Sequence, residues 1–90
     1  MKLKLFSIYD SKAKNYDRVI TLRTTEEAIR SFSYSINDEK HQYSTYPEDF
    51  VLFELGTYDE DTGMIEPYSS PISIGVGVNF VKKASVSEQV

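Results

Sequence analysis

Residues 24–36, TTEEAIRSFSYSI, have the spacing of an amphipathic α-helix. Thr24 can cap the helix start, and Glu27, three positions later, completes a capping box. The apolar residues recur at helical spacing and form a single stripe: Ala28, Ile29, Phe32 and Ile36. A helix with one apolar stripe needs a second layer to cover, and the strand patterns around it supply a sheet. The segment therefore favours an α+β fold.

Extended segments flank this helix on both sides. Residues 2–9 and 18–23 are rich in strand-forming residues, and we expect them to pair as a hairpin. Residues 50–58 carry the strongest strand pattern, and after a hairpin loop at 59–63 the chain should return antiparallel over 64–68. We predict a small, mainly antiparallel sheet of four to five strands, with one amphipathic helix packed on one face.

The domain organisation follows from these segments. We expect a single α+β domain over residues 1–70, because 90 residues leave no room for a second one. Beyond Pro71 the apolar residues alternate with small or polar ones: Ile72, Ile74, Val76, Val78 and Phe80. This alternation is typical of a strand, although two glycines weaken it. We interpret residues 71–90 as an edge strand or a docking tail with a frayed C-terminus.

The composition excludes several classes of protein. With no cysteine, the chain has neither a disulfide scaffold, a thiolate zinc site nor a cysteine nucleophile. Because His41 is the only histidine, sites with paired imidazoles are ruled out and no Ser-His-Asp triad is expected. The apolar runs are too short to span a bilayer and the start lacks a signal peptide, so we expect a soluble protein in a reducing compartment.

No cofactor, no metal site and no catalytic residues are expected, and we predict that the protein is not an enzyme. The segment from Asp59 to Gly63 is similar to the start of a calcium loop, but Ser70 stands where that loop needs its last glutamate. A hairpin turn is the better interpretation. Nowhere does the sequence bring together an acid–base pair or an activated nucleophile.

Charge is divided unevenly along the chain. The net charge is −4, yet residues 1–40 carry eight basic and six acidic residues, whereas residues 41–90 carry two and eight. A net negative charge argues against a protein that coats nucleic acid through bulk charge. Any contact with nucleic acid must therefore come from the first half of the chain.

Within that half, the loop between the first two strands is the strongest candidate for binding. Single-stranded nucleic acid is held by cations along its backbone and by aromatic rings on which bases stack. The predicted binding residues are Lys12, Lys14, Tyr16, Arg18 and Arg23. Tyr9 can add a second ring, while Asp10 and Asp17 dilute the positive charge. The alternative is an ordinary solvated loop.

A group of tyrosines, Tyr34, Tyr43 and Tyr46, lies near further basic residues in the sequence. Tyrosine serves both as a stacking surface and at half-buried boundaries of a core or interface. Both interpretations stay open, and the boundary is favoured.

The order of short motifs along the chain resembles that of a known small family. The matching segments are LFSIYDSKA at 5–13, RTTEEAIRSF at 23–32, ND at 37–38, PEDF at 47–50, LFELG at 52–56, Asp59 and DTG at 61–63. Together they resemble the small non-structural protein of gokushoviruses, the icosahedral single-stranded-DNA bacteriophages of the microvirus family. The resemblance covers about residues 3–67 and leaves out the segment after Pro71.

The resemblance implies a protein of the bacterial host cytoplasm, absent from the mature capsid, with a part in viral DNA synthesis or packaging. It supplies no catalytic residues. Our first hypothesis is a non-enzymatic accessory protein that binds single-stranded DNA weakly. The alternative is an adaptor for viral replication or assembly proteins with no direct DNA contact. Such an adaptor can add residues 72–80 to a partner sheet, or form a homodimer through them or through another edge strand.

Overall fold

The structure is a computed structural model that describes residues 1–82; the frayed end expected from residue 84 lies outside them. The elements, in chain order, are β1 (Lys2–Asp10), β2 (Asn15–Tyr16), β3 (Ile20–Leu22), α1 (Thr25–Ile36), α2 (Gln42–Thr45), η1 (Pro47–Asp49), β4 (Phe50–Asp59), β5 (Ile65–Val76) and η2 (Gly77–Phe80). Here η marks a short 3₁₀ helix.

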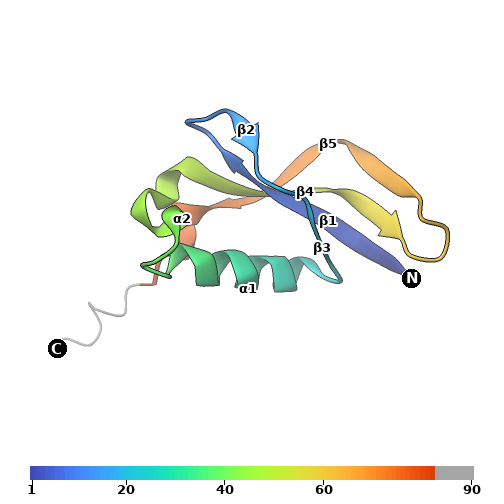
Figure 1. Cartoon of the computed structure of the whole chain (residues 1–90), viewed down its shortest axis with the longest axis horizontal. Coiled ribbons are helices and arrows are strands. Elements are labelled where there is room, and N and C mark those ends of the chain that lie inside the picture. The colour runs from blue at the N-terminus through green and yellow to red at the C-terminus, as the bar shows by residue number, and fades with distance from the viewer. Residues whose placement is uncertain (83–90) are drawn as a thin grey trace.

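The strands form one antiparallel sheet (Figure 1). Its order is β2-β1-β4-β5, and β3 pairs with β1 as well. The predicted hairpin between residues 2–9 and 18–23 is confirmed by the pairing of Lys4 with Leu22 and of Phe6 with Ile20. The turn at Asp59–Gly63 is also confirmed, since Asp59 N–H donates to the Met64 carbonyl across 2.9 Å.

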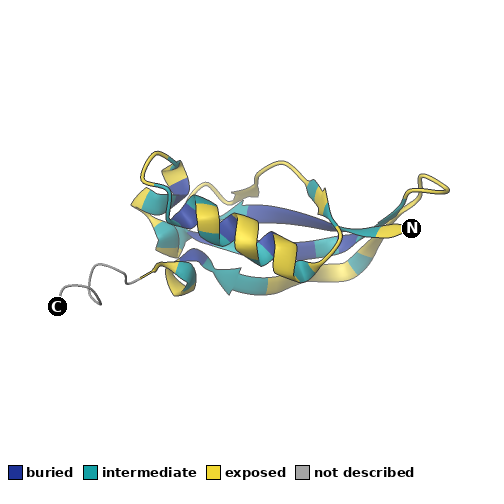
Figure 2. Ribbon diagram, turned by 90° about the horizontal axis from the view of Figure 1, so that it is seen from below, coloured by how far each residue is buried: buried dark blue, intermediate teal, exposed yellow. Residues whose placement is uncertain are grey.

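Helix α1 packs along one face of the sheet (Figures 1 and 2). It begins with the predicted capping box, in which Thr24 and Glu27 bind each other's backbone N–H groups. Its apolar stripe is buried against the two central strands; the core contains Phe6, Ile8, Ala28, Phe32, Ile36 and Leu52. Burying each large apolar side chain stabilises the fold by about 1.5–3 kcal/mol. The predicted α+β class is confirmed. In the described part of the chain, no helix covers the other face of the sheet.

The segment after residue 64 follows the expectation in part, because the antiparallel return and the edge strand beyond Pro71 are confirmed as far as Val76. Strand β5 runs along the edge of the sheet from Ile65 to Val76, and its pairing with β4 is irregular between Pro67 and Ile72. The boundary expected at residue 70 falls inside this strand. The strand pattern predicted as far as residue 80 is wrong beyond Val76, because the chain turns there into η2. A Cβ at Gly77 would lie 2.5 Å from Ile36 Cδ1 and from the Pro47 carbonyl, so glycine permits a close approach that ends the strand.

The aromatic ring of Phe80 attaches η2 to helix α1. It packs edge-on against Phe32 of α1, with the ring centroids 5.5 Å apart. Asn37 at the end of α1 donates to the Phe80 carbonyl across 3.0 Å. The connection after α1 contains the short helices α2 and η1. The His41 side chain caps α2 by accepting from the Tyr43 N–H.

Candidate nucleic-acid interface

A tight turn at residues 11–14 joins β1 to β2 and carries Lys12 and Lys14. The Asp10 carboxylate accepts hydrogen bonds from the N–H groups of Lys12 and Ala13, at 2.9 and 3.1 Å. Lys14 N–H donates to the Asp10 carbonyl across 2.7 Å, and its φ of 62° lies in the left-handed region. These bonds fix the backbone of the turn, from which both lysines extend into solvent.

The ring of Tyr16 lies on the sheet face away from α1. Tyr16 pairs with Tyr9 across β1 and β2, and their ring centroids are 4.8 Å apart. Phe53 of β4 supports the same ring from a third strand at 5.6 Å. Because Tyr16 is still 43% exposed, the two neighbours hold its ring in place while part of its surface stays open.

Arg18 is separated from Tyr16 by an irregularity in the ladder. Tyr9 pairs with Tyr16 and Phe6 with Ile20, so the three residues 17–19 face only the two residues 7–8 of β1. The buried hydroxyl of Ser7 fills the bulge and donates to the Asp17 and Arg18 carbonyls, at 2.7 and 3.2 Å. An extra residue of this kind re-aims the next side chain. Arg18 consequently lines a cavity beneath α1, whereas Tyr16 faces the opposite side.

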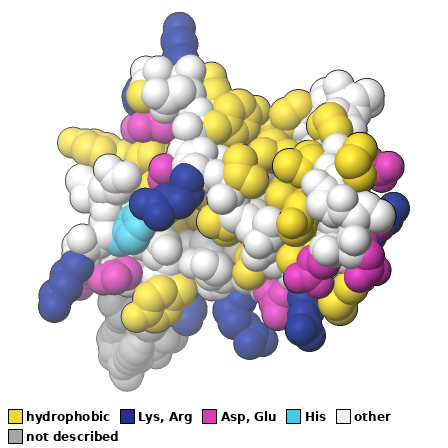
Figure 3. Space-filling model, turned by 45° about the vertical axis from the view of Figure 1, so that its right-hand side comes forward, with side chains coloured by type: hydrophobic (Ala, Val, Ile, Leu, Met, Phe, Trp, Pro, Cys, Tyr) yellow, Lys and Arg dark blue, Asp and Glu magenta, His cyan; other side chains and the backbone are white. Residues whose placement is uncertain are grey.

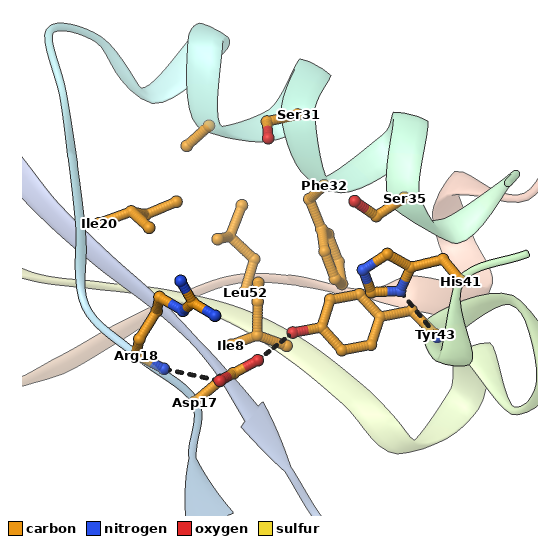
Figure 4. A pocket seen from close by; sticks show the side chains of 11 residues that line it. Ile8, Asp17, Arg18, Ile20, Ser31, Phe32, Ser35, His41, Tyr43 and Leu52 are labelled. Atoms are coloured by element: carbon orange, nitrogen blue, oxygen red, sulfur yellow. Dashed lines mark hydrogen bonds between the residues drawn. The ribbon is translucent and has the colours of Figure 1, made fainter.

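Two of the acidic residues near the turn, Asp10 and Asp17, are occupied by internal hydrogen bonds, and a third, Asp49, lies beside the turn, where its carbonyl accepts from the Ser11 N–H at 2.9 Å. Asp10 binds the turn, and Asp17 accepts from the Arg18 N–H at 2.8 Å and from the Tyr43 hydroxyl at 2.7 Å (Figure 4). In residues 1–82 no ion pair involves Lys12, Lys14 or Arg18. We call these three residues the cationic tip. Their charged groups are free to meet the phosphates of a ligand.

This bonding favours the ionised form of Asp17. The hydrogen bond from Tyr43 is the main reason why the pKa of the Asp17 carboxyl lies below its ordinary value. Burial, followed by the same hydrogen bond, raises the pKa of the Tyr43 hydroxyl. The tyrosine thus remains the donor and the aspartate the acceptor over the physiological pH range.

Arg23 does not lie with the other predicted site residues. It follows β3 at the level of Leu3, whereas the turn lies beyond Asp10. At about 3.3 Å per residue along β1, this separation is about 20 Å. Arg23 N–H donates to Glu27 Oε1 across 2.9 Å as part of the helix cap. The structure therefore brings together Lys12, Lys14 and Tyr16, places Arg18 just around the edge of the sheet, and excludes Arg23.

The three tyrosines do not form a second stacking surface. Tyr43 is only 7% exposed, and its ring packs on Phe50 at 4.6 Å and on His41 at 4.2 Å. Tyr34 and Tyr46 are 74% and 59% exposed. Tyr43 is a buried residue of the core, so the stacking interpretation is wrong for it and the favoured half-buried boundary does not describe it either. Sequence reasoning missed Phe53, whose place beside Tyr16 depends on the pairing of β1 with β4.

Residues 1–82 contain no group of three or more His, Asp or Glu side chains arranged to hold a metal ion. None of the described helices is long and apolar enough to cross a membrane.

Comparisons with known proteins give two matches. A family model described as "Phage ORF5 protein" matches residues 3–80. Protein ORF5 of Chlamydia phage 1 is 33% identical over 96 residues, and the alignment covers 100% of both chains. The family match extends past the end of the resemblance at residue 67 and includes β5 and η2. No solved structure matches the chain.

Proposed function

The chain belongs to the Phage ORF5 protein family, and from that premise we propose that it is a non-enzymatic accessory protein that binds single-stranded DNA weakly. The resemblance to the small non-structural protein of gokushoviruses is confirmed. Its place of action in this proposal is the cytoplasm of the bacterial host, during viral DNA synthesis or packaging. The family name states no activity, so the proposal depends on the geometry of the chain.

The observation that supports it is a set of unpaired cations beside a supported aromatic ring. Lys12 and Lys14 leave a fixed turn, Arg18 lies around the sheet edge, and none of the three has an ionic partner among the described residues. Tyr16 presents part of its ring near the same turn. Phosphates and bases of a flexible strand need this combination of charge and flat apolar surface.

The position of the acidic hairpin after β4 is compatible with the same proposal. Lys2 pairs with Asp59 and Asp10 with Phe50, so the acidic hairpin after β4 and the cationic tip lie at opposite ends of β1 (Figure 1). Their separation, about 25 Å at 3.3 Å per residue, exceeds the screening length of about 8 Å at physiological salt. The hairpin therefore does not neutralise the tip. The net charge of −4 limits nonspecific coating of host DNA.

A salt titration tests the proposal. Binding is measured by the fluorescence anisotropy of a labelled oligothymidylate. The logarithm of the association constant should fall with the logarithm of the salt concentration at a slope of about −2, because three phosphate contacts each contribute about −0.7. Between about 50 and 200 mM salt the affinity should fall about 20-fold. A duplex of the same length is the comparison and should bind less tightly, because its bases cannot stack on Tyr16. Binding that is undetectable near 50 mM or independent of salt would contradict the proposal.

The edge of the sheet favours a second candidate function, an adaptor for viral proteins. Strand β5 has β4 on one side only, and Ile72 is 49% exposed. Pro67 and Pro71 cannot donate to a further strand, so pairing with a partner or a second copy would use residues 72–76. Light scattering should then give twice the chain mass of 10.3 kDa, or a larger complex with the partner.

The matched variant for this candidate is Ile72→Lys, because lysine on an edge strand opposes pairing. Removal of residues 71–90 is a poor test, since it deletes the Phe80 contact with Phe32 and so part of the core. The adaptor would be contradicted if the wild type has the mass of one chain and captures no partner, and if Ile72→Lys has the same mass.

A further inference from the structure

A cavity of about 320 Å³ lies beneath α1, on the side of the sheet that Arg18 faces (Figure 4). Its walls come from β1, the segment between β2 and β3, β3, α1, the connection to α2, α2 and β4. The apolar lining consists of Ile8, Ile20, Ala28, Phe32 and Leu52. Polar side chains surround this lining: Asp17, Arg18, Ser31, Ser35, His41 and Tyr43. The volume is at the lower end of that of small-molecule sites, about 300–1,000 Å³.

Four of these polar groups have no hydrogen-bond partner among residues 1–82: the Arg18 guanidinium, the Ser31 and Ser35 hydroxyls, and His41 Nε2. In Figure 4 they face the cavity. His41 Nδ1 accepts from the Tyr43 N–H across 3.1 Å, so the neutral ring carries its proton on Nε2 and donates from there. Figure 3 shows the only histidine of the chain at the surface beside a basic side chain.

The remaining polar pair of the cavity is already satisfied. Asp17 and Tyr43 bind each other, and the second Asp17 oxygen accepts from the Arg18 N–H. Of the groups left over, the Arg18 guanidinium and His41 Nε2 are donors, the Ser31 and Ser35 hydroxyls can donate or accept, and Arg18 carries a permanent positive charge. A complementary ligand has a small apolar body, oxygen acceptors and a negative charge. A nucleotide has all three features, because its base is flat and carries acceptor atoms and its phosphate is anionic.

We propose that this cavity binds one nucleotide of the single strand, with the base against the apolar lining and its phosphate on Arg18. The inference rests on the proposed function and extends it, since Arg18 belongs both to the cationic tip and to the cavity mouth. A strand that stacks one base on Tyr16 can pass around the edge at residues 17–19 and place a neighbouring base beneath α1. The bulge at these residues places the two sites on opposite sides of the same sheet edge.

Thymidine monophosphate is the first probe. Its binding is monitored by the amide chemical shifts in the nuclear magnetic resonance spectrum of the full chain. Saturable shifts are expected around Ser31, Ser35 and His41, and thymidine without its phosphate should bind at least several-fold more weakly. A peptide with an apolar side chain and a carboxylate, N-acetyl-phenylalanyl-aspartate, is the competing ligand. Shifts caused by this peptide but not by the nucleotide would assign the cavity to a protein partner and overturn the inference. The absence of any shift would overturn it as well.

The second test uses oligothymidylate and a pair of variants on α1. Ser31→Trp fills the cavity from its rim, whereas Tyr34→Trp adds bulk at a position that does not line it. Ser31→Trp should weaken binding about tenfold, within the range known for loss of one stacked base, and Tyr34→Trp should not. Circular dichroism checks that both variants fold; if Ser31→Trp does not, Ser35→Leu takes its place.

The two proposals fail in different ways. If the wild type does not bind oligothymidylate, the proposed function fails and the nucleotide cavity with it. If the wild type binds with the expected salt dependence and the cavity-filling variant binds equally well, only the cavity inference is overturned. An oligomer of abasic sugar phosphates supplies the same charges without bases, and equal binding to it by both variants is expected.

Discussion

The Tyr43 hydroxyl donates a hydrogen bond of 2.7 Å to the Asp17 carboxylate, across 26 positions of sequence. This bond joins α2 to the bulge that redirects Arg18, and both of its residues line the cavity beneath α1. Ser7 holds the same bulge from the sheet through two carbonyls. The position of Arg18 thus depends on side chains from two distant segments, and not on its own strand.

Tyr43→Phe tests this support. The variant keeps the buried ring but removes one of the two donors of Asp17, so the free energy of unfolding should fall by about 1.5–3 kcal/mol, as for a hydrogen bond to a charged group. Urea denaturation measures the change. Tyr34→Phe is the control, because Tyr34 is 74% exposed and its hydroxyl has no hydrogen-bond partner in the described residues, and it should be neutral. Equal stability of the two variants would show that the bond contributes nothing.

Glu54 should make stability depend on pH. It is 7% exposed and accepts from Tyr68 at 2.6 Å and Thr25 at 2.9 Å, with Lys4 Nζ at 3.5 Å. Burial alone raises the pKa of Glu54, but the hydrogen bonds from Tyr68 and Thr25 and the charge of Lys4 outweigh it, so the pKa lies below its ordinary value of 4.5. A lowered pKa in the folded state means that the carboxylate stabilises the fold above 4.5, and that this stability is lost as the pH falls through the folded value.

The matched pair for this prediction is Glu54→Gln and Glu66→Gln. At neutral pH the first should lower the free energy of unfolding by about 1–3 kcal/mol, because it removes a charged acceptor from a buried network. The second should change it little, since the Glu66 side chain is 69% exposed. Urea midpoints at decreasing pH should show the deficit of Glu54→Gln shrinking below 4.5. A deficit that is constant with pH would contradict the lowered pKa.

The helix and the central strands could be predicted from local sequence because their signals are local. The capping box of Thr24 and Glu27 and the apolar stripe of α1 each lie within a few turns. The end of β5 could not be predicted, because it depends on Ile36 and Pro47 approaching Gly77 from distant segments. Alternation of Val78 and Phe80 looks the same in sequence whether the chain stays extended or turns.

The candidate site shows the same limit. Lys12, Lys14 and Tyr16 lie in one tight hairpin, so their proximity follows from the turn alone. Arg18 has the parity of Tyr16 in the sequence, and a regular strand would place both on one face. The extra residue in the bulge, which the sequence does not mark, separates them. Arg23 follows β3 at the level of Leu3, which is the end of the hairpin far from the turn, so it cannot reach the other site residues.

Removal of single charges should distinguish the tip from Arg23. Lys12→Ala and Lys14→Asn should each reduce the salt slope of oligothymidylate binding by about 0.7, the loss of one phosphate contact. Asparagine is chosen at position 14 because it tolerates the left-handed φ of 62°. Arg23→Ala removes the same charge at a distance from the turn and should leave the slope unchanged. Equal effects of all three variants would mean that only net charge matters, which contradicts a local contact.

Gly56→Ala should disrupt the pairing of β4 with β5. Gly56 is buried and faces Pro67, and a Cβ there would lie 2.7 Å from Pro67 Cα and would collide with the Glu66 carbonyl oxygen. Both neighbours are backbone, so β5 would have to move as a unit, and the free energy of unfolding should fall by more than about 2 kcal/mol, as for overpacking in a core. Gly63→Ala is the matched control. Its Cβ meets nothing within 4 Å, and only the positive φ of 76° opposes it, at a cost of about 1 kcal/mol. Urea denaturation of both variants separates the two causes. A larger loss of unfolding free energy in Gly63→Ala would contradict the prediction, because it would show that backbone strain in the hairpin limits the stability of this sheet edge more than the close approach of the strands does.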